Sequence, residues 1–240
     1  MGSDVVKVAI HQPHYLPWLG YFAKMDEADV FIFLDTVQFE KHGWQNRNRI
    51  KTSQGWQWLT VPVSARFPAL LSEVAVDNGQ GWARKHVQAL HTHYAKAPAF
   101  QQEFDGLAEV LGRPWDALVE LNCSLTLYLA SRLGLDKKIV RASTLPARDT
   151  PTDRLMDLCR AVGGTVYLAG NDGTRYMDLE RCAAAGIEVW RQEYRHPLYR
   201  QLYGDFIPSM AVVDLLFNEG DASLAVLRSG HGWSRSEPGP

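Results

Sequence analysis

Two kinds of hydrophobic pattern alternate along the chain: short continuous apolar runs, and longer stretches with an apolar residue every three or four positions. Residues 5–10 (VVKVAI) and 30–34 (VFIFL) are continuous runs typical of buried strands, and residues 18–28 between them have helical spacing. Pro13 and Pro17 follow the first run and predict a rigid loop between strand and helix. A strand, loop, helix and strand in this order need a right-handed crossover, and they therefore predict a parallel sheet.

The pattern changes twice in the middle of the chain. Residues 36–53 are strongly polar, after which residues 58–63 (WLTVPV) resume a strand pattern and residues 73–76 predict a short edge strand. Residues 80–136 have helical periodicity with breaks at prolines and a glycine, so we expect an inserted helical subdomain there. Its helices are predicted at residues 82–94, 100–111 and 115–133.

An α/β pattern returns in the last part of the chain. Strands are predicted at residues 138–142, 165–169 and 187–190, and helices at residues 152–162, 176–185 and 208–217, the last with Pro208 in its first turn. The tail SGHGWSRSEPGP is rich in Gly, Ser and Pro, which predicts disorder. The fold class is thus α/β, a mostly parallel sheet flanked by helices. We expect an α/β core with a ligand crevice (1–79 and 137–228), a helical insertion (80–136) and a disordered tail (229–240).

Composition narrows the class of protein. The 240 residues are 46% hydrophobic and carry a formal net charge of −2, which allows a full core but gives no basic excess for generic nucleic-acid binding. No apolar run approaches the roughly 18 to 20 residues of a membrane span, and the N-terminus has no signal-peptide pattern, so we expect a cytoplasmic protein without membrane contact.

Polar residues follow the predicted strands at several points. The first strand ends at His11 and Gln12, the second at Asp35, and a later one at Gly170 and Asn171 in a Gly-rich turn whose amides could cradle a phosphate or carboxylate. In open α/β sheets, ligands bind outside the carboxyl ends of the strands. If the strands are neighbours, these groups converge on one crevice.

The chemistry of the two histidines in the first loop leaves alternatives open. His11 could act as a general acid or base, contact a phosphate, or cap the next helix. His14 lies in a proline-flanked H-x-x-H, which lacks the helical i, i+4 spacing that aims two imidazoles at one metal, so no metal site is predicted. Asp35 directly follows an apolar run and must reach the rim, a cation or a hydrogen-bond donor.

Residues 38–51 contain the densest group of polar side chains in the chain. As an extended segment, it would place Gln45, Arg47 and Arg49 on one side and Asn46 and Asn48 on the other. Two interpretations fit: a solvated edge strand, or a loop that grips a polyanionic or hydroxylated ligand through Arg and amide side chains. The second is favoured, with Trp44, Trp56 and Trp58 available to stack on a ring.

Several motifs together resemble the WbqC-like proteins of bacterial surface-polysaccharide and natural-product gene clusters, over about residues 5–228. The motifs are IHQPxYLPWLGYFxK (10–24), FLDxVQFxK (33–41), WQNRNRIK (44–51), WLTVPV (58–63), YLAG (167–170) and DLLFNEG (214–220). Residue by residue, the polar motifs fall on His11, Gln12, Tyr15, Asp35, Gln38, Lys41, Gln45, Asn46, Arg47, Asn48 and Arg49. His14 departs from the family pattern, which often has Asn there.

The resemblance implies a link to modified amino sugars, and transfer of an acyl or aminoacyl group such as glycyl onto an amine. The partner would be a small phosphorylated or nucleotide-linked substrate. Two alternatives stay open: a ligase or nucleotidyltransferase that uses ATP and magnesium, and a non-catalytic nucleotide-sugar-binding module. The predicted catalytic residues are His11, Asp35 and Lys41. The predicted substrate-binding residues are Gln12, Tyr15, Gln38, Gln45, Asn46, Arg47, Asn48, Arg49, Gly170 and Asn171.

Overall fold

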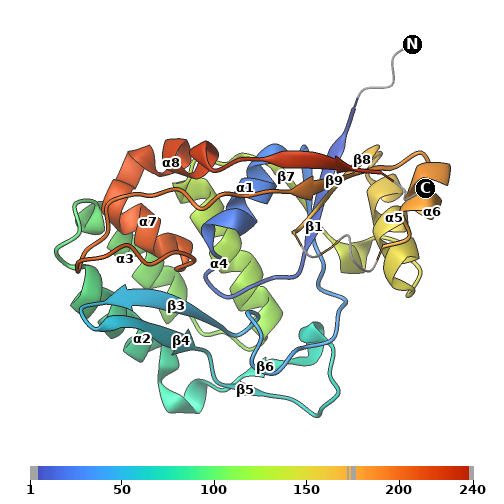
Figure 1. The fold of residues 1–240 in the computed structure, drawn as a ribbon. Helices are drawn as coiled ribbons and strands as arrows, with labels where there is room; N and C mark the ends of the chain where they lie inside the picture. The colour runs from blue at the N-terminus through green and yellow to red at the C-terminus, as the bar shows by residue number, and fades with distance from the viewer. Residues whose placement is uncertain (1–4, 172, 174–176, 238–240) are drawn as a thin grey trace.

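A six-stranded sheet forms the centre of the protein (Figure 1), which was obtained as a computed structural model describing residues 5–171, 173 and 177–237. The strand order is β10-β9-β8-β1-β2-β7; the five strands from β9 to β7 are parallel and β10 is antiparallel to β9. The bounds are β1 Lys7–His11, β2 Val30–Phe33, β7 Lys138–Arg141, β8 Val166–Ala169, β9 Glu188–Gln192 and β10 Trp233–Ser236. The predicted α/β class with a mostly parallel sheet is therefore confirmed.

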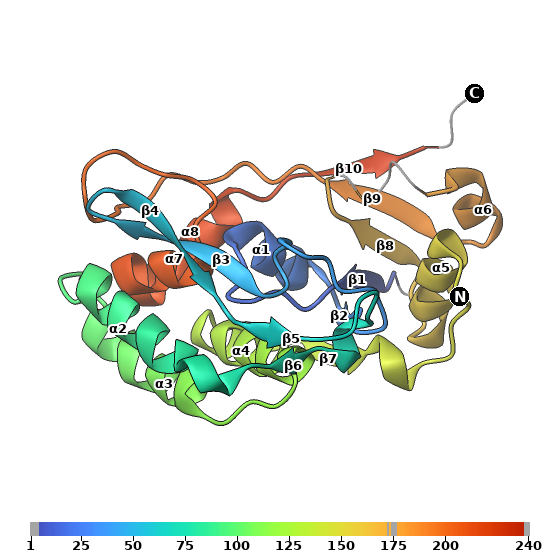
Figure 2. The ribbon, with the colours of Figure 1, turned by 90° about the horizontal axis from the view of Figure 1, so that it is seen from below.

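Helices cover both faces of the sheet, as Figures 1 and 2 show. Alternate residues of a strand point to opposite faces, so Val8 and Ile10 of β1 pack in one hydrophobic cluster while Ala9 packs in the other. The smaller cluster lies under α5 and α6, and the larger lies under the remaining helices. The bounds are α1 Leu19–Glu27, α2 Trp82–Tyr94, α3 Phe100–Gly112, α4 Leu118–Arg132, α5 Pro151–Ala161, α6 Leu179–Ala184, α7 Val212–Glu219 and α8 Ser223–Ser229.

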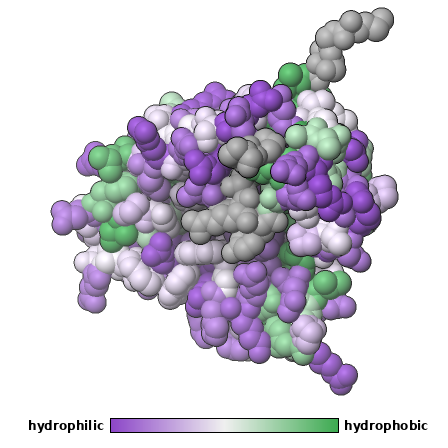
Figure 3. All heavy atoms as spheres, turned by 45° about the vertical axis from the view of Figure 1, so that its right-hand side comes forward, coloured by the Kyte–Doolittle hydropathy of each residue, from purple (hydrophilic) through white to green (hydrophobic). Residues whose placement is uncertain are grey.

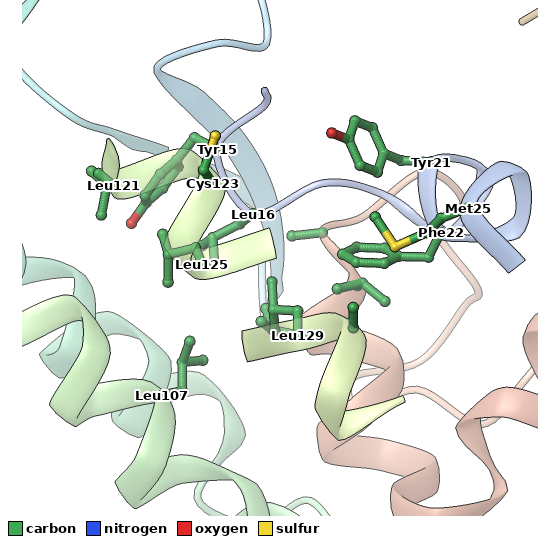
Figure 4. Close-up of a cluster of buried hydrophobic side chains, with 14 of the residues drawn as sticks. Tyr15, Leu16, Tyr21, Phe22, Met25, Leu107, Leu121, Cys123, Leu125 and Leu129 are labelled. Carbon is green, nitrogen blue, oxygen red and sulfur yellow. The ribbon is translucent and has the colours of Figure 1, made fainter. Parts of the chain in front are cut away.

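The larger cluster joins the first loop and α1 to the helices between β6 and β7. Figure 4 shows part of it, with Tyr15 and Leu16 of the loop, Phe22 of α1 and Leu129 of α4 among the labelled side chains. All four residues are almost completely buried. Since a buried leucine or phenylalanine contributes about 1.5 to 3 kcal/mol, this cluster fixes the loop that carries His11 and His14.

Two small antiparallel pairs lie outside the main sheet. Strands β3 (Arg47–Thr52) and β4 (Gly55–Thr60) form a hairpin, and β5 (Val63–Ser64) pairs with β6 (Ala75–Val76). The hairpin shows that part of the polar stretch is a strand, although Asn48, Ile50 and Lys51 are buried and the strand is not simply a solvated edge.

Two predictions for the last part of the chain were wrong. The helix expected from Pro208 begins four residues later as α7, because Ser209 has a φ of 60° and the Ala211 amide donates to the Arg49 carbonyl instead of to a helical turn. The tail expected to be disordered contains β10, in which Trp233 pairs with Gln192 of β9. The predicted start of the helix at Tyr176 lies outside the described residues. The division into core and insertion stays a prediction.

The surface gives no sign of an extended apolar face on the side shown in Figure 3, where the described residues are mostly hydrophilic and hydrophobic residues form small separate groups. None of the helices in the described part of the chain combines the length and the apolar character that a membrane crossing requires.

Candidate functional site

A cavity of about 710 Å³ opens at the carboxyl ends of the parallel strands. The chain continues from β1 to β2 on one side, while β8 lies on the other side of β1, so the order of the strands reverses between β1 and β8. Such a switch point is where open α/β sheets bind ligands. We call this space the switch-point cavity. It is lined by Ile10, His11, Gln12, His14, Trp18, Gly20, Tyr21, Lys24, Leu34, Leu155, Tyr167, Gly170, Asn171, Gly173, Arg191, Gln192, Glu193 and Tyr194.

Lys24 of α1 reaches this cavity from the interior of the protein. Its side chain follows Tyr21 by three positions, so both lie on the helix face that borders the end of β1. Lys24 is 2% exposed, and its ammonium donates to the Ile10 carbonyl over 3.2 Å. Burial lowers the pKa of Lys24 from 10.5 to about 7. No carboxylate among the described residues forms an ion pair with it.

The histidines of the first loop lie beside Lys24. The ring centroids of His11 and His14 are 4.7 Å apart, and that of Tyr21 lies 4.5 Å from His11. Burial, with the nearby Lys24 charge, holds the pKa of His11 well below 6.5 and lowers that of His14 to about 3. Both rings are therefore neutral near neutral pH. The Nδ1 atom of His11 lies 3.1 Å from the Gln12 carbonyl, an arrangement that places its proton on Nδ1 and leaves Nε2 free to accept one.

A second, smaller cavity of about 310 Å³ adjoins the hairpin, and we call it the Arg49 cavity. The guanidinium carbon of Arg49 lies 5.0 Å from the ring centroid of Trp56, 5.7 Å from Trp44 and 5.9 Å from Trp58. Its Nε is buried and has no hydrogen-bond partner within the described chain, and one terminal nitrogen donates to the Ser209 carbonyl over 3.4 Å. The indole rings thus hold the guanidinium at the wall of this cavity. The lining residues are His14, Trp18, Trp44, Asn48, Arg49 and Ser209.

The two cavities share His14 and Trp18. A molecule in the switch-point cavity and another in the Arg49 cavity would therefore meet the same two side chains. Trp18 is held in place by Tyr194 and His196, whose ring centroids lie 5.7 and 6.3 Å from its own. The arrangement is that of a site with two compartments and a common wall.

The structure brings six of the predicted site residues to these cavities. His11, Gln12, Gly170 and Asn171 line the switch-point cavity, and Asn48 and Arg49 line the Arg49 cavity. Positions 172 and 174 of the predicted Gly-rich turn lie outside the described residues.

Four other predicted residues take part in buried hydrogen bonds that hold the loops together. The Tyr15 hydroxyl lies 2.7 Å from Nδ1 of His86, and the Asn46 amide donates to the Val61 carbonyl over 2.9 Å. The amide nitrogen of Gln45 lies 3.0 Å from the Gln12 side-chain oxygen and 3.4 Å from the Gln38 carbonyl oxygen. Gln45 therefore supports Gln12, while Gln38 takes part through its backbone.

The remaining three predicted residues, Asp35, Lys41 and Arg47, do not line either cavity. Asp35 is 4% exposed and accepts from the amide and hydroxyl of Ser143 over 2.9 and 2.7 Å, so both carboxylate oxygens are engaged. The Lys41 ammonium lies 3.9 Å from the Phe67 ring centroid. Arg47 stacks 4.3 Å from the Trp58 ring and donates to the His42 carbonyl.

Sequence reasoning passed over Lys24, although a signal was present. Lys24 belongs to the helical stretch 18–28, in which almost every neighbour is apolar, and a lysine among them has to be buried or snorkel to solvent. Trp18, which borders both cavities, was likewise not among the predicted site residues. Neither residue directly follows a predicted strand, which is the position that predicts a ligand-binding residue in an open α/β sheet.

No metal centre emerges from the part of the chain that the structure describes, because three or more His, Cys, Asp or Glu side chains are nowhere grouped to hold an ion. Among the described residues that line the switch-point cavity, Glu193 alone carries a carboxylate, whereas magnesium prefers oxygen ligands.

The fold and the site define an open α/β protein with a ligand cavity at the switch point of its sheet. The chain belongs to the WbqC-like protein family, whose sequence model matches residues 12–226. It is 38% identical over 226 residues to the uncharacterized protein Rv1507c of Mycobacterium tuberculosis strain ATCC 25618 / H37Rv, across 92% of this chain and 97% of that protein. No solved structure matches the chain.

Proposed function

We propose that the protein transfers an acyl or aminoacyl group, such as glycyl, to the amine of a phosphorylated or nucleotide-linked amino sugar. The observation that carries this proposal is the common wall of the two cavities, since transfer requires two substrates to meet at one point. The larger cavity suits the amino sugar and the smaller one suits the acyl group with its activating group. Both volumes lie in or near the range of roughly 300 to 1,000 Å³ usual for ligand pockets.

In this mechanism the amine nitrogen attacks the activated carbonyl carbon near His14. The new C–N bond forms as the bond to the leaving group breaks, and the leaving group departs with that electron pair. His11 Nε2 accepts the proton that the amine loses, a role that suits a ring kept neutral by its surroundings. The guanidinium of Arg49 holds the anionic leaving group.

One feature favours transfer over the ligase alternative, and a second favours it over the binding module. A ligase or nucleotidyltransferase would place magnesium beside the triphosphate, and the described lining residues offer imidazoles, an ammonium and an Arg191–Glu193 ion pair instead of a carboxylate cluster. The wall common to both cavities also goes beyond what a binding module for one nucleotide sugar needs.

The test is a turnover assay with glucosamine 1-phosphate as the amine and acetyl phosphate or a glycyl thioester as the donor, read by mass spectrometry for the new amide. We expect His11→Ala to lower turnover by about 10²- to 10⁴-fold, the usual contribution of a positioned base, while acceptor binding changes by less than a few-fold. His91→Ala, an exposed histidine of α2, is the matched control and should leave turnover unchanged.

Two results would contradict the proposal. Full turnover in His11→Ala would remove the proposed base. Release of AMP or pyrophosphate from ATP and magnesium, dependent on the amine, would instead support the ligase alternative.

A further inference from the structure

Lys24 is a buried cation without an anionic partner in the described chain. Its hydrogen-bond acceptor is the neutral Ile10 carbonyl at 3.2 Å, and it is 2% exposed. A buried ammonium is costly unless it is paired, so a lysine at this position favours the binding of an anion beside it. The ammonium lies at the junction of β1 and β8, since a Cβ on Gly170 would be 3.9 Å from its nitrogen.

The side chains around Lys24 leave space for an anion. The imidazoles of His11 from β1 and His14 from the first loop carry no negative charge. The carboxylate of Glu193 is paired with Arg191 at 2.9 Å. Gly170, Asn171 and Gly173 line the β8 side of the cavity, and the Gly173 amide donates to the Gly170 carbonyl over 3.0 Å. Among the described residues, the ionisable groups that face the cavity with Lys24 are His11, His14, Tyr21, Tyr167, Arg191, Glu193 and Tyr194.

We infer that the switch-point cavity is an oxyanion site in which Lys24 binds the phosphate group of the amine-bearing substrate. The inference rests on the proposed function in that it assigns this anion to the acceptor. Phosphate would then be bound by a buried lysine of α1, and not by the hairpin, where the sequence has its densest group of polar side chains. His14 and Trp18, at the wall towards the Arg49 cavity, would then face the sugar amine.

Binding at such a site is coupled to protonation. The pKa of Lys24 is about 7 in the empty cavity, and a phosphate beside it raises that pKa because it stabilises the charged form. At pH 8 the empty site is mostly neutral, so phosphate binding takes up close to one proton per molecule. At pH 6 Lys24 is already charged, and it contributes almost no uptake. Affinity therefore falls by up to about tenfold per pH unit above 7.

The experiment is isothermal titration of the full chain with glucosamine 1-phosphate at pH 6, 7 and 8. Each titration is made in two buffers of different ionisation enthalpy, so that the dependence of the heat on the buffer gives the number of protons taken up. Glucosamine is the ligand without an anion, and inorganic phosphate and acetate show whether the site takes phosphate or any small oxyanion.

Lys24→Met keeps the length of the side chain and removes its charge. We expect it to weaken binding of glucosamine 1-phosphate at pH 7 by at least about tenfold and to abolish the uptake at pH 8. Lys7→Met is the matched control, because Lys7 lies at the start of β1, at the other end of that strand from Ile10, and pairs with Glu27. It should leave both quantities unchanged. Thermal unfolding of each variant verifies that it is folded.

Three outcomes would overturn the inference: binding unchanged in Lys24→Met, no proton uptake at pH 8 in the unmodified protein, or acetate binding as tightly as phosphate. Proton uptake that is instead larger at pH 6 than at pH 8 would assign the anion to the histidines and would also overturn the inference. Failure of the proposed function has a different signature. Phosphate binding and proton uptake would then persist although no amide product forms. Turnover that is unaffected by Lys24→Met would contradict the anion site and leave the proposed function standing.

Discussion

The β3–β4 hairpin and the switch-point cavity both contain basic groups, but they differ in whether those groups have partners within the protein. On the hairpin, Arg47 stacks on Trp58, and the Lys51 ammonium donates to the Asp205 carbonyl and lies near Asp214. In the cavity, the Lys24 ammonium has only the Ile10 carbonyl, and no carboxylate of the described chain pairs with it. The cations of the hairpin thus mostly contact other groups of the protein, whereas the Lys24 ammonium remains available to bind an anionic ligand.

The contrast shows why dense charge in a sequence is a poor guide to a binding site. A cluster of cations on one strand can be satisfied by nearby rings and carbonyls of the same chain, which makes it part of the fold. A single cation buried without a partner costs free energy in the empty protein and is therefore the stronger indication of function. Arg49 is intermediate, since indole rings hold it while it also lines the Arg49 cavity.

The largest expected effect is on stability. In the folded protein the pKa of Lys24 is about 7, against about 10.5 in the unfolded chain, so between these values the unfolded chain binds more protons and Lys24 makes stability rise with pH. From pH 7 to pH 9 the rise amounts to roughly 2 to 3 kcal/mol. Lys24→Met should remove it and be the more stable protein at pH 6, as measured by urea unfolding across pH 6 to 9.

The parallel experiment on Lys7→Met sharpens this comparison, because Lys7 is paired with Glu27. That variant should keep the rise in stability with pH. If Lys24→Met and the unmodified protein show the same pH dependence, Lys24 is not a buried cation without a partner, and the contrast between the two regions fails.

A smaller effect separates the two arginines of the hairpin. Arg49 lines the Arg49 cavity and Arg47 does not, although both stack on indole rings. We expect Arg49→Met to lower kcat/KM for the acyl donor by about 10- to 100-fold, the effect of losing a charge-assisted contact of roughly 1.5 to 3 kcal/mol. Arg47→Met should change kcat/KM by less than about threefold. Equal losses in the two variants would show that the hairpin acts as one cationic surface.

The sequence predicted the order of the strands and helices because each carries its own hydrophobic period, and it predicted His11 and Gly170 at the site because both follow buried strands. For Lys24 the apolar stretch 18–28 leaves two positions open, burial or snorkelling to solvent, and only the packing of α1 against β1 shows that this lysine points inwards. Asp35 also follows a strand, yet β2 lies one strand away from the switch point and its carboxylate serves Ser143.

For β10, the composition of the tail indicated disorder, while the open edge of β9 supplied pairing partners that composition does not show. The start of α7 was likewise decided at a distance, because the carbonyls of Arg49 and Pro17 accept the amides of Ala211 and Val212. In both places a contact with a remote part of the chain outweighed the local pattern.

The smallest expected effect concerns Lys41, which the sequence placed among the catalytic residues. Its ammonium lies over the Phe67 ring, and both residues are exposed, so the contact is worth about 0.5 to 1 kcal/mol. Lys41→Met should therefore lower the free energy of unfolding by less than about 1 kcal/mol and leave kcat/KM within about twofold. A loss of tenfold or more would mean that Lys41 reaches the substrate from outside both cavities. The hairpin side would then hold a functional cation of its own, and the division between structural charge on the hairpin and free charge in the cavity would have to be abandoned.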